Sequence, residues 1–412
     1  MFWVVVTAVA LLAATSLLMS SAQAQVRVIG IQAAPQAATA SDLYFALSDL
    51  DAQVARLVLI DDADALSGTQ IDALSAYRER GLQIDTDLAR AVRGATSDAD
   101  RELVTRLLGD LAVFREWAWQ ALAVESQLPP QAPGKLPPAA LGYYTQATNV
   151  LHIDLLPTAK RLRDASRTRL DQAYRDQLRT EVIGIGLAVL LGGALVALLV
   201  FLQIWLARRF RRLINPALAA ATLITFGLVC SAGAVFLLDG ERLRAARADS
   251  LTPFLALSQA RALSYDAAAD TSRYLISANL EYYKQDFTAK SGCLLNGGDC
   301  AAGGLPAGSE AAKRWQSYRR DHEKIVGLAD AGRGGAAIDA LTGIRRGDAA
   351  FDFSYFDAAI SADADARKQA FDASLRSAER LLTGWVEIPI VAIGLVLLLV
   401  PLGVRKRLAE YR

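Results

Sequence analysis

Few side chains in this sequence have the types and spacing that catalysis or metal binding requires. The 412 residues include two histidines, His152 and His322, and three cysteines. The sequence has no Gly-x-Gly-x-x-Gly or Walker-type phosphate loop, no Gly-x-Ser-x-Gly nucleophile elbow and no His-Glu-x-x-His zinc motif. We therefore expect no catalytic, cofactor-binding or metal-binding residues, and a protein that is not an enzyme.

The cysteines predict a local crosslink. Cys293 and Cys300 flank a glycine-rich stretch, residues 294–299, and a disulfide between them would close a short loop in an oxidising compartment. Two free thiols or half of a metal site are the alternatives, although two histidines make a Cys/His zinc cluster unfavourable. Cys230 lies within an apolar run, where cysteine is typically a small packing residue.

The histidines and aromatic residues favour structural roles. His152 lies beside Asp154 in a predicted helix, and His322 lies in a charged stretch, residues 319–324, that is typical of a solvated helix face. Several aromatic residues could line a ligand cleft, but packing in a helical core is the favoured interpretation. These residues are Tyr44, Tyr143, Tyr144, Tyr282, Tyr283 and the aromatic cluster of residues 351–356.

Four apolar runs set the frame that must position all these residues. They cover residues 2–19, 182–206, 217–238 and 388–404, and at about 1.5 Å rise per residue each can cross or nearly cross a hydrocarbon core about 30 Å thick. A hydrophobic content of 53% fits a multi-pass membrane protein. The net charge of +1 gives no reason to expect nucleic-acid binding.

Clusters of basic residues predict the orientation of the chain in the membrane. The short loop between the second and third runs carries four arginines, and the segment after the fourth run is also basic, which favours the cytoplasmic side for both. Both large segments then lie outside the cell. The residues predicted to hold this topology and to contact a cytosolic partner are Arg208, Arg209, Arg211, Arg212, Arg405, Lys406 and Arg407.

Both large segments have helical periodicity. Apolar residues from Leu43 to Leu57 recur with 4-3-4-3 spacing, a helix is expected to end at Gly94, and the next is expected to begin at a cap around Ser97. Pro157 should kink the helix that leads to the second apolar run. Strand signals are nearly absent. We predict an all-α membrane protein with four transmembrane helices and two extracytoplasmic domains that resemble four-helix bundles.

The two halves share details that indicate an internal duplication. Ala46-Leu47-Ser48 and residues 256–258 repeat the same tripeptide in the first helix of each large segment. Glu181 and Glu387 lie at the entries to the second and fourth apolar runs. Intramembrane acids suggest transport, but a solvated helix end is the favoured interpretation of both glutamates.

These patterns predict the following organisation. Residues 1–24 form the first transmembrane helix, an anchor that is favoured over a cleaved signal peptide despite a signal-peptidase-like Ala22-Gln23-Ala24. The other predicted segments are a first bundle at 25–181, a transmembrane helix at 182–206, a cytoplasmic loop at 207–216, a transmembrane helix at 217–238, a second bundle at 239–385, a transmembrane helix at 386–404 and a cytoplasmic tail at 405–412.

One stretch of the sequence resembles a known family. Residues 41–54, SDLYFALSDLDAQV, are similar to the first extracytoplasmic helix of actinobacterial GlnX-type membrane proteins, and the likeness in plan covers nearly the whole chain. The resemblance implies a link between an extracytoplasmic lipoprotein that binds acidic amino acids and their amides and a cytosolic Ser/Thr protein kinase. The sequence lacks the short basic leader expected in that family, which calls the assigned start into question.

The leading hypothesis is therefore a non-enzymatic signal transducer. It would relay the state of an amino-acid-binding protein through the membrane to a cytosolic kinase, with membrane lipid as a further partner and a homo-oligomer left open. A chemoreceptor-like sensor that binds a small ligand directly and a structural membrane scaffold are the alternatives. Transport is disfavoured because the apolar runs offer no polar site at the membrane midplane.

Overall fold

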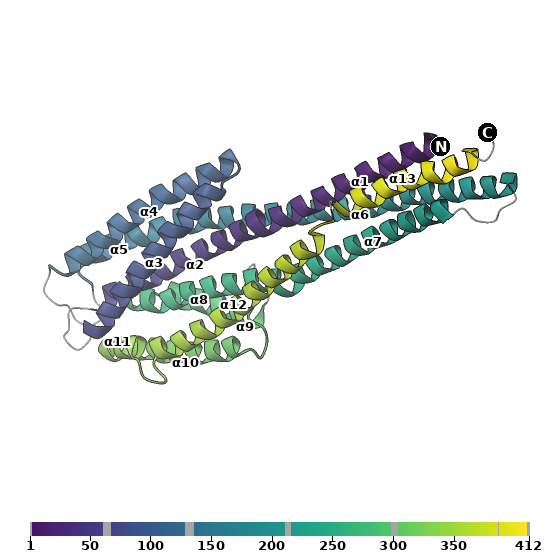
Figure 1. Cartoon of the computed structure of the whole chain (residues 1–412). Coiled ribbons are helices and arrows are strands. Elements are labelled where there is room, and N and C mark those ends of the chain that lie inside the picture. Colours follow the sequence, from purple (N-terminus) through teal and green to yellow (C-terminus); the bar gives the residue numbers. More distant parts are fainter. Residues whose placement is uncertain are drawn as a thin grey trace. The chain divides into compact units, whose positions relative to one another are not determined.

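The computed structural model describes residues 2–60, 67–127, 136–210, 216–297, 304–385 and 387–409. Within these ranges the chain forms helices and no strand, which confirms the predicted all-α fold (Figure 1). The helices are α1 (Phe2–Arg27), α2 (Ala34–Leu59), α3 (Ser67–Gly94), α4 (Asp98–Glu125), α5 (Pro138–Asn149), α6 (Leu156–Phe210), α7 (Pro216–Ala246), α8 (Thr252–Ile276), α9 (Glu281–Asn296), α10 (Glu310–Asp330), α11 (Gly334–Thr342), α12 (Ala349–Leu382) and α13 (Glu387–Ala409).

The chain divides into two compact units. A membrane unit comprises Met1–Ala33, Arg169–Asp249 and Ala370–Arg412, and a bundle unit comprises Ala34–Thr168 and Ser250–Gln369. Both of the predicted bundle domains thus contribute helices to one unit, in which α2 packs along α8 (Figure 1). Four helical stretches are long and apolar enough to cross a membrane, as the sequence predicted.

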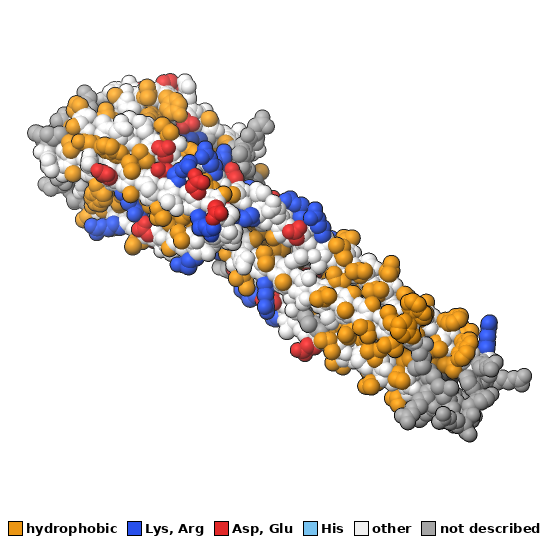
Figure 2. All heavy atoms as spheres, turned by 90° about the horizontal axis from the view of Figure 1, so that it is seen from above, with side chains coloured by type: hydrophobic (Ala, Val, Ile, Leu, Met, Phe, Trp, Pro, Cys, Tyr) orange, Lys and Arg blue, Asp and Glu red, His pale blue; other side chains and the backbone are white. Residues whose placement is uncertain are grey.

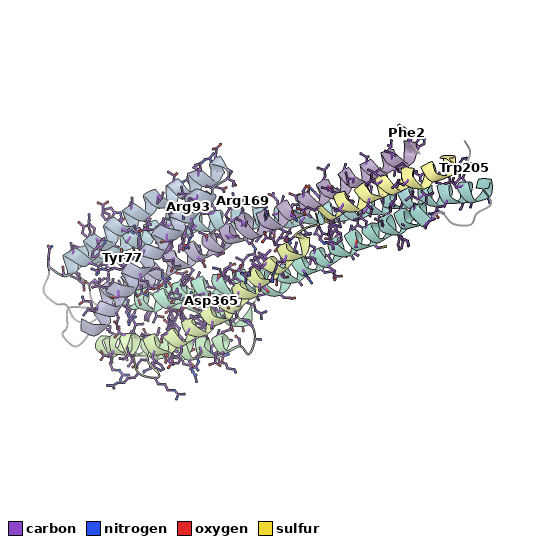
Figure 3. The ribbon with its side chains drawn as sticks, in the orientation of Figure 1. Phe2, Tyr77, Arg93, Arg169, Trp205 and Asp365 are labelled. Atoms are coloured by element: carbon purple, nitrogen blue, oxygen red, sulfur yellow. The ribbon has the colours of Figure 1, made fainter. Side chains whose placement is uncertain are left out.

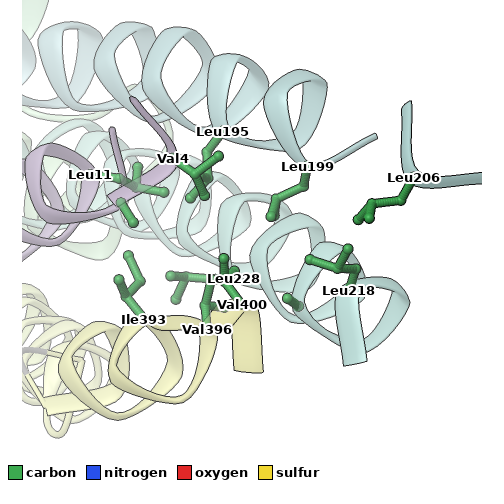
Figure 4. Close-up of a cluster of buried hydrophobic side chains, with 12 residues drawn as sticks. Val4, Leu11, Leu195, Leu199, Leu206, Leu218, Leu228, Ile393, Val396 and Val400 are labelled. Atoms are coloured by element: carbon green, nitrogen blue, oxygen red, sulfur yellow. The ribbon is translucent and has the colours of Figure 1, made fainter. Parts of the chain in front are cut away.

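The membrane unit has an apolar interior and an apolar surface. Side chains from α1, α6, α7 and α13 form a shared core that includes Leu11, Leu195, Leu228 and Val396 (Figure 4). The outward surface is also apolar, and Figure 2 shows hydrophobic side chains gathered over one part of the face that it draws. Exposed examples are Val189 (62%), Phe201 (68%), Leu223 (71%) and Val391 (71%). Such a surface is unfavourable in water and suits contact with lipid.

Exposed aromatic side chains lie at one end of the membrane unit. Phe2 is 72% exposed and Trp205 is 55% exposed, and in Figure 3 both lie at the end of the unit where α1 begins and α6 finishes. Trp3 beside Phe2 is 69% exposed. Trp and Tyr are enriched where membrane helices reach the headgroup level, and the exposure of Trp3 and Trp205 fits that depth.

The bundle unit begins its helices where the sequence predicted. Helix α3 ends at Gly94, and α4 starts after Ser97, whose hydroxyl accepts a hydrogen bond from the backbone N–H of Asp100 while the Asp100 carboxylate accepts one from the backbone of Ser97. This reciprocal capping satisfies two N–H groups that a helix start leaves without partners. The cap residues thus fix where α4 begins.

In the described part of the chain, three π-helical turns interrupt the long helices, and a proline follows each of them. The turns cover Val28–Ala33, Val150–Leu155 and Arg247–Leu251, and the prolines are Pro35, Pro157 and Pro253. Proline has no N–H to donate and its ring crowds the carbonyl four residues earlier, so a widened turn before it relieves the conflict. The kink predicted at Pro157 therefore takes the form of a π-helical turn.

One expectation about the membrane-entry glutamates is wrong. Glu387 is exposed, but Glu181 is buried and accepts a hydrogen bond from Arg244 Nη2 at 2.8 Å. The space for the Glu181 carboxylate comes from Gly240, where a Cβ atom would lie only 2.2 Å from Glu181 Oε2. Gly240 thus leaves room for the ion pair between Glu181 on α6 and Arg244 on α7. The sequence around Glu181 does not predict this pair, because both Gly240 and Arg244 belong to another helix.

The adjacent glycines Gly192 and Gly193 provide a test of helix packing in the membrane unit. A Cβ at Gly192 would lie 2.2 Å from Val229 Cγ2 and 3.2 Å from its Cβ, whereas a Cβ at Gly193 would meet nothing within 4 Å. We expect Gly192→Ala to cost about 1–3 kcal/mol through overpacking. Gly193→Ala makes the same gain in helix propensity without the clash. Unfolding of the detergent-solubilised protein measures both, and equal stabilities would contradict the close approach of α6 and α7.

Candidate functional site

A charged stripe runs along one face of helix α8. Asp266, Asp270 and Arg273 are spaced i, i+4 and i+7, so they lie on the same side of the helix. Small residues, among them Ala262 and Ala269, let neighbouring helices approach α8 closely. The stripe is therefore buried against α2 and α9 rather than hydrated.

The side chain of Arg273 is at the centre of this stripe. It is 2% exposed, and Nη1 donates hydrogen bonds to Asp270 Oδ1 at 2.5 Å and to Asp266 Oδ1 at 3.2 Å. Nη2 donates to Asp51 Oδ2, which comes from α2 in the first half of the chain and is 1% exposed. Arg273 is thus held by three carboxylates from two helices.

Helix α9 supplies the second cation. Lys290 Nζ lies 2.8 Å from Asp266 Oδ2, 2.7 Å from Asp270 Oδ2 and 2.7 Å from Asp286 Oδ2. The side chain of Lys290 is 13% exposed. We call the six residues Asp51, Asp266, Asp270, Arg273, Asp286 and Lys290 the Arg273 cluster.

The electrostatics of the Arg273 cluster favour the ionised forms of most members. Burial opposes ionisation of Asp51 and Asp266, but Arg273 in the first case and Lys290 with Arg273 in the second outweigh burial and lower both pKa values. Burial raises the pKa of Asp270 to about 6, against the opposing effects of Arg273 and Lys290. For Arg273 and Lys290, the neighbouring carboxylates outweigh burial and raise the pKa values. Four carboxylates face two cations, so the cluster is rich in negative charge.

A second group of contacts joins the same helices. Two guanidinium groups lie over the ring of Phe45 on α2, with Arg261 at 4.1 Å and Arg80 at 4.6 Å from its centroid. Arg261 forms a two-point ion pair with Asp357 on α12, at 2.6 and 2.8 Å. Tyr265 packs edge-on against Phe45 at a centroid distance of 5.1 Å. Helix α2 is therefore fastened to α8 by stacking as well as by charge.

The π-helical turn at Val150–Leu155 brings a histidine to the edge of the Arg273 cluster. His152 Nε2 lies 3.8 Å from Asp51 Oδ2, and its side chain is 33% exposed. Tyr144 on α5 is buried, and burial, reinforced by the charge of Asp51, raises the pKa of its hydroxyl. α5 and the turn after it thus face the same carboxylate that binds Arg273.

The Arg273 cluster is suited to holding helices together. Its carboxylates are engaged by the two cations, and within the described ranges no group of three or more histidine, cysteine or acidic residues is arranged to hold a metal ion. Removing one partner from a buried ion pair leaves a charge without compensation. The cluster can therefore resist separation of α2, α8 and α9.

The residues predicted as sites from the sequence lie elsewhere. Cys293 is on α9, but Cys300 lies outside the described residues, so the disulfide stays a prediction. Arg208 is exposed near the end of α6, and Arg211 and Arg212 lie outside the described residues. Arg209 lies in α6, and the basic residues Arg405, Lys406 and Arg407 lie in α13.

The expected solvated position of His322 is wrong. Its residue exposure is 4%, its ring stacks on Phe287 at a centroid distance of 3.5 Å, and its Nδ1 lies 2.9 Å from Thr271 Oγ1. Burial lowers its pKa to about 3. The charged neighbours Arg319 and Glu323 point outward from α10, while Trp315, Tyr318 and His322 share the inward face.

The aromatic residues divide between core and surface. Tyr144 and Phe356 are buried, as the core interpretation predicted, whereas Tyr282 is 62% exposed. Phe353 makes edge-on ring contacts with both Tyr265 and Tyr318, at centroid distances of 4.8 and 5.1 Å. These three rings come from α12, α8 and α10, so residues far apart in the sequence form one aromatic wall.

The sequence reasoning missed the Arg273 cluster. Its signal was present as three charged residues at helical spacing within a helix otherwise rich in alanine and serine. Without its partners, such a stripe is typical of a solvated helix face. One partner of the stripe, Asp51, lies 222 residues from Arg273 in the sequence, and another, Lys290, lies on α9.

The central role of Arg273 predicts a large loss of stability on its removal. Arg273→Met would leave Asp51, Asp266 and Asp270 buried with one fewer cation, at a cost of about 3–5 kcal/mol. Arg115→Met is the control, because it breaks an ion pair with Asp85 between α4 and α3 whose side chains are 33% and 53% exposed. That pair should contribute no more than about 1 kcal/mol. Denaturant unfolding measures both, and equal losses would show that the cluster is not a special constraint.

Comparison with known proteins gives a match for the first half of the chain. Residues 25–175 match the family model of an actinobacterial sensor domain. No curated protein and no solved structure matches the chain. The matched segment contains Asp51 on α2, which belongs to the Arg273 cluster, and His152 in the π-helical turn, which lies beside the cluster. Residues 25–175 are thus similar to an actinobacterial sensor domain, and this similarity indicates a signal-sensing role.

Proposed function

We propose that the chain is a non-enzymatic transmembrane signal transducer for amino acids of the glutamate and aspartate type. It would relay the state of an extracytoplasmic amino-acid-binding protein to a cytosolic Ser/Thr protein kinase. The observation that carries the proposal is the match of residues 25–175 to a sensor domain whose helix α2 is ion-paired to the second half of the chain through Asp51 and Arg273. The partners and the ligand class come from the resemblance of residues 41–54 to GlnX-type proteins.

The helices offer a route for the signal. Four helical stretches that contain the apolar runs continue beyond them, the first from Phe2 to Leu59 and the third from Pro216 to Ile276. A binding protein that prefers one arrangement of the bundle helices would shift the population toward it. Small shifts or rotations of continuous helices are an established way to carry such a change.

Two of the π-helical turns lie at the boundary between the two compact units. The boundary between the two compact units falls at Ala33 in the first stretch and at Asp249 in the third, and both residues belong to π-helical turns. π-helical turns are frequent at functional sites, and a turn with altered hydrogen bonding can adjust more readily than a regular α-helix. We propose that these turns absorb the change between signalling states.

The proposed orientation puts both halves of the bundle unit outside the cell. The basic segments at Arg208–Arg212 and Arg405–Arg407 then face the cytoplasm, by the positive-inside rule, and are the surfaces available to the kinase. A duplicated ancestry of the two halves is part of the same proposal, since each half would place one pair of membrane helices on one set of outside helices.

A proline in the last long helix tests the transducer. Leu375→Pro removes a backbone hydrogen bond in α12 and costs about 3 kcal/mol or more locally, so it should abolish the dependence of kinase-target phosphorylation on external glutamate. Leu375→Ala removes the same side chain and keeps the helix, and it should retain the response. Phosphorylation is measured in cells in which both variants reach the membrane. An unchanged response in Leu375→Pro would contradict helix coupling and favour a structural scaffold.

A further inference from the structure

A cavity in the bundle unit lies between the two halves of the chain. Its volume is about 70 Å³, which is room for about five water molecules. Residues from α2, α8, α10, α11 and α12 line it, and Tyr265, Tyr318 and Phe353 form its aromatic wall. The cavity is separate from the charged stripe of the Arg273 cluster, because none of the six cluster residues lines it.

One cation, Arg56, lines this cavity. Its side chain is partly buried, and no carboxylate in the described ranges lies within ion-pair distance of it. Asp49 on the same helix is paired with Arg80, and Asp357 on α12 is paired with Arg261. Asp72 acts on Arg56 only through the longer-range electrostatic field.

The surroundings of Arg56 disfavour its charge. Burial lowers the pKa of the guanidinium, and Asp72 offsets this only in part. A partly dehydrated guanidinium with no close anion among the described residues has unused donor capacity in a fixed planar fork, and this fork fits a carboxylate with two hydrogen bonds. The remaining lining provides Gln53 and Ser272 as polar groups beside small and aromatic side chains.

We propose that this cavity is a binding site for a small free carboxylate, held by Arg56 and packed against Tyr265, Tyr318 and Phe353. The volume suits a carboxylate with a short side chain. Helix α2 contributes Arg56 and the other helices contribute the wall. An occupied site would therefore connect the two halves at a second point, more than one helical turn along α2 from Asp51. The protein would bind this ligand whether or not it also binds a separate binding protein.

Thermal unfolding of the full-length protein in lipid nanodiscs tests the site. Sodium acetate, sodium propionate and sodium L-glutamate are the probes, with sodium chloride and methylammonium chloride at equal ionic strength as controls. At least one carboxylate should raise the unfolding midpoint in a saturable way, and neither control should. The absence of a saturable shift with all three carboxylates would overturn the proposal.

Variants then locate the binding. Arg56→Gln should weaken carboxylate binding by about tenfold or more, because a charge-assisted hydrogen-bond pair is lost. Arg161→Gln removes the same charge from an exposed position on α6 and should leave binding unchanged. Ala350→Leu fills the cavity from α12 and should abolish the shift while the protein still unfolds cooperatively. Wild-type affinity in both Arg56→Gln and Ala350→Leu would place the carboxylate elsewhere and overturn the proposal. Loss of binding together with a retained kinase response would leave the proposed relay intact.

Discussion

A buried guanidinium has to be matched by carboxylates, and this requirement determines how the helices of the bundle unit meet. Removing a charge from water costs several kcal/mol even after relaxation, so Arg273 is stable in its position only while Asp51, Asp266 and Asp270 surround it. Two of those carboxylates come from its own helix. The third comes from α2, and this makes the first half of the chain necessary to the second.

Several other features follow from this constraint. The alanines and serines of α8 allow α2 close enough for Asp51 to reach Arg273, and the rings of Phe45 and Tyr265 fill the space beside the ion pairs. The segment that matches the sensor-domain model, residues 25–175, is therefore tied to the second half of the chain, because a displacement of α2 would either move α8 with it or leave Arg273 buried without Asp51. A sensing element fixed in this way to helices that continue into apolar spans is suited to relay a change of state.

The sequence predicted features that depend on neighbours in the chain. The four helical stretches long and apolar enough to cross a membrane, the end of α3 at Gly94 and the cap at Ser97 all follow from local pattern, and the structure confirms them. It did not predict features that depend on distant partners. His322 is buried although its stretch of the sequence is charged, because most of the charged residues lie on one face of α10 and His322 lies on the other. Glu181 is buried because Gly240, on another helix, has no side chain and leaves space for the carboxylate. The Cys293–Cys300 disulfide and the protein partners stay predictions.

The most direct test of the central claim is a double-mutant cycle on Asp51 and Arg273. Unfolding free energies of the wild type, Asp51→Asn, Arg273→Gln and the double variant give the coupling between the two side chains. A shared buried ion pair that fastens the two halves predicts that the double variant loses less stability than the two single losses added together, by about 1.5 kcal/mol or more. Additivity within about 0.5 kcal/mol would show that the two residues act independently, and would contradict the account.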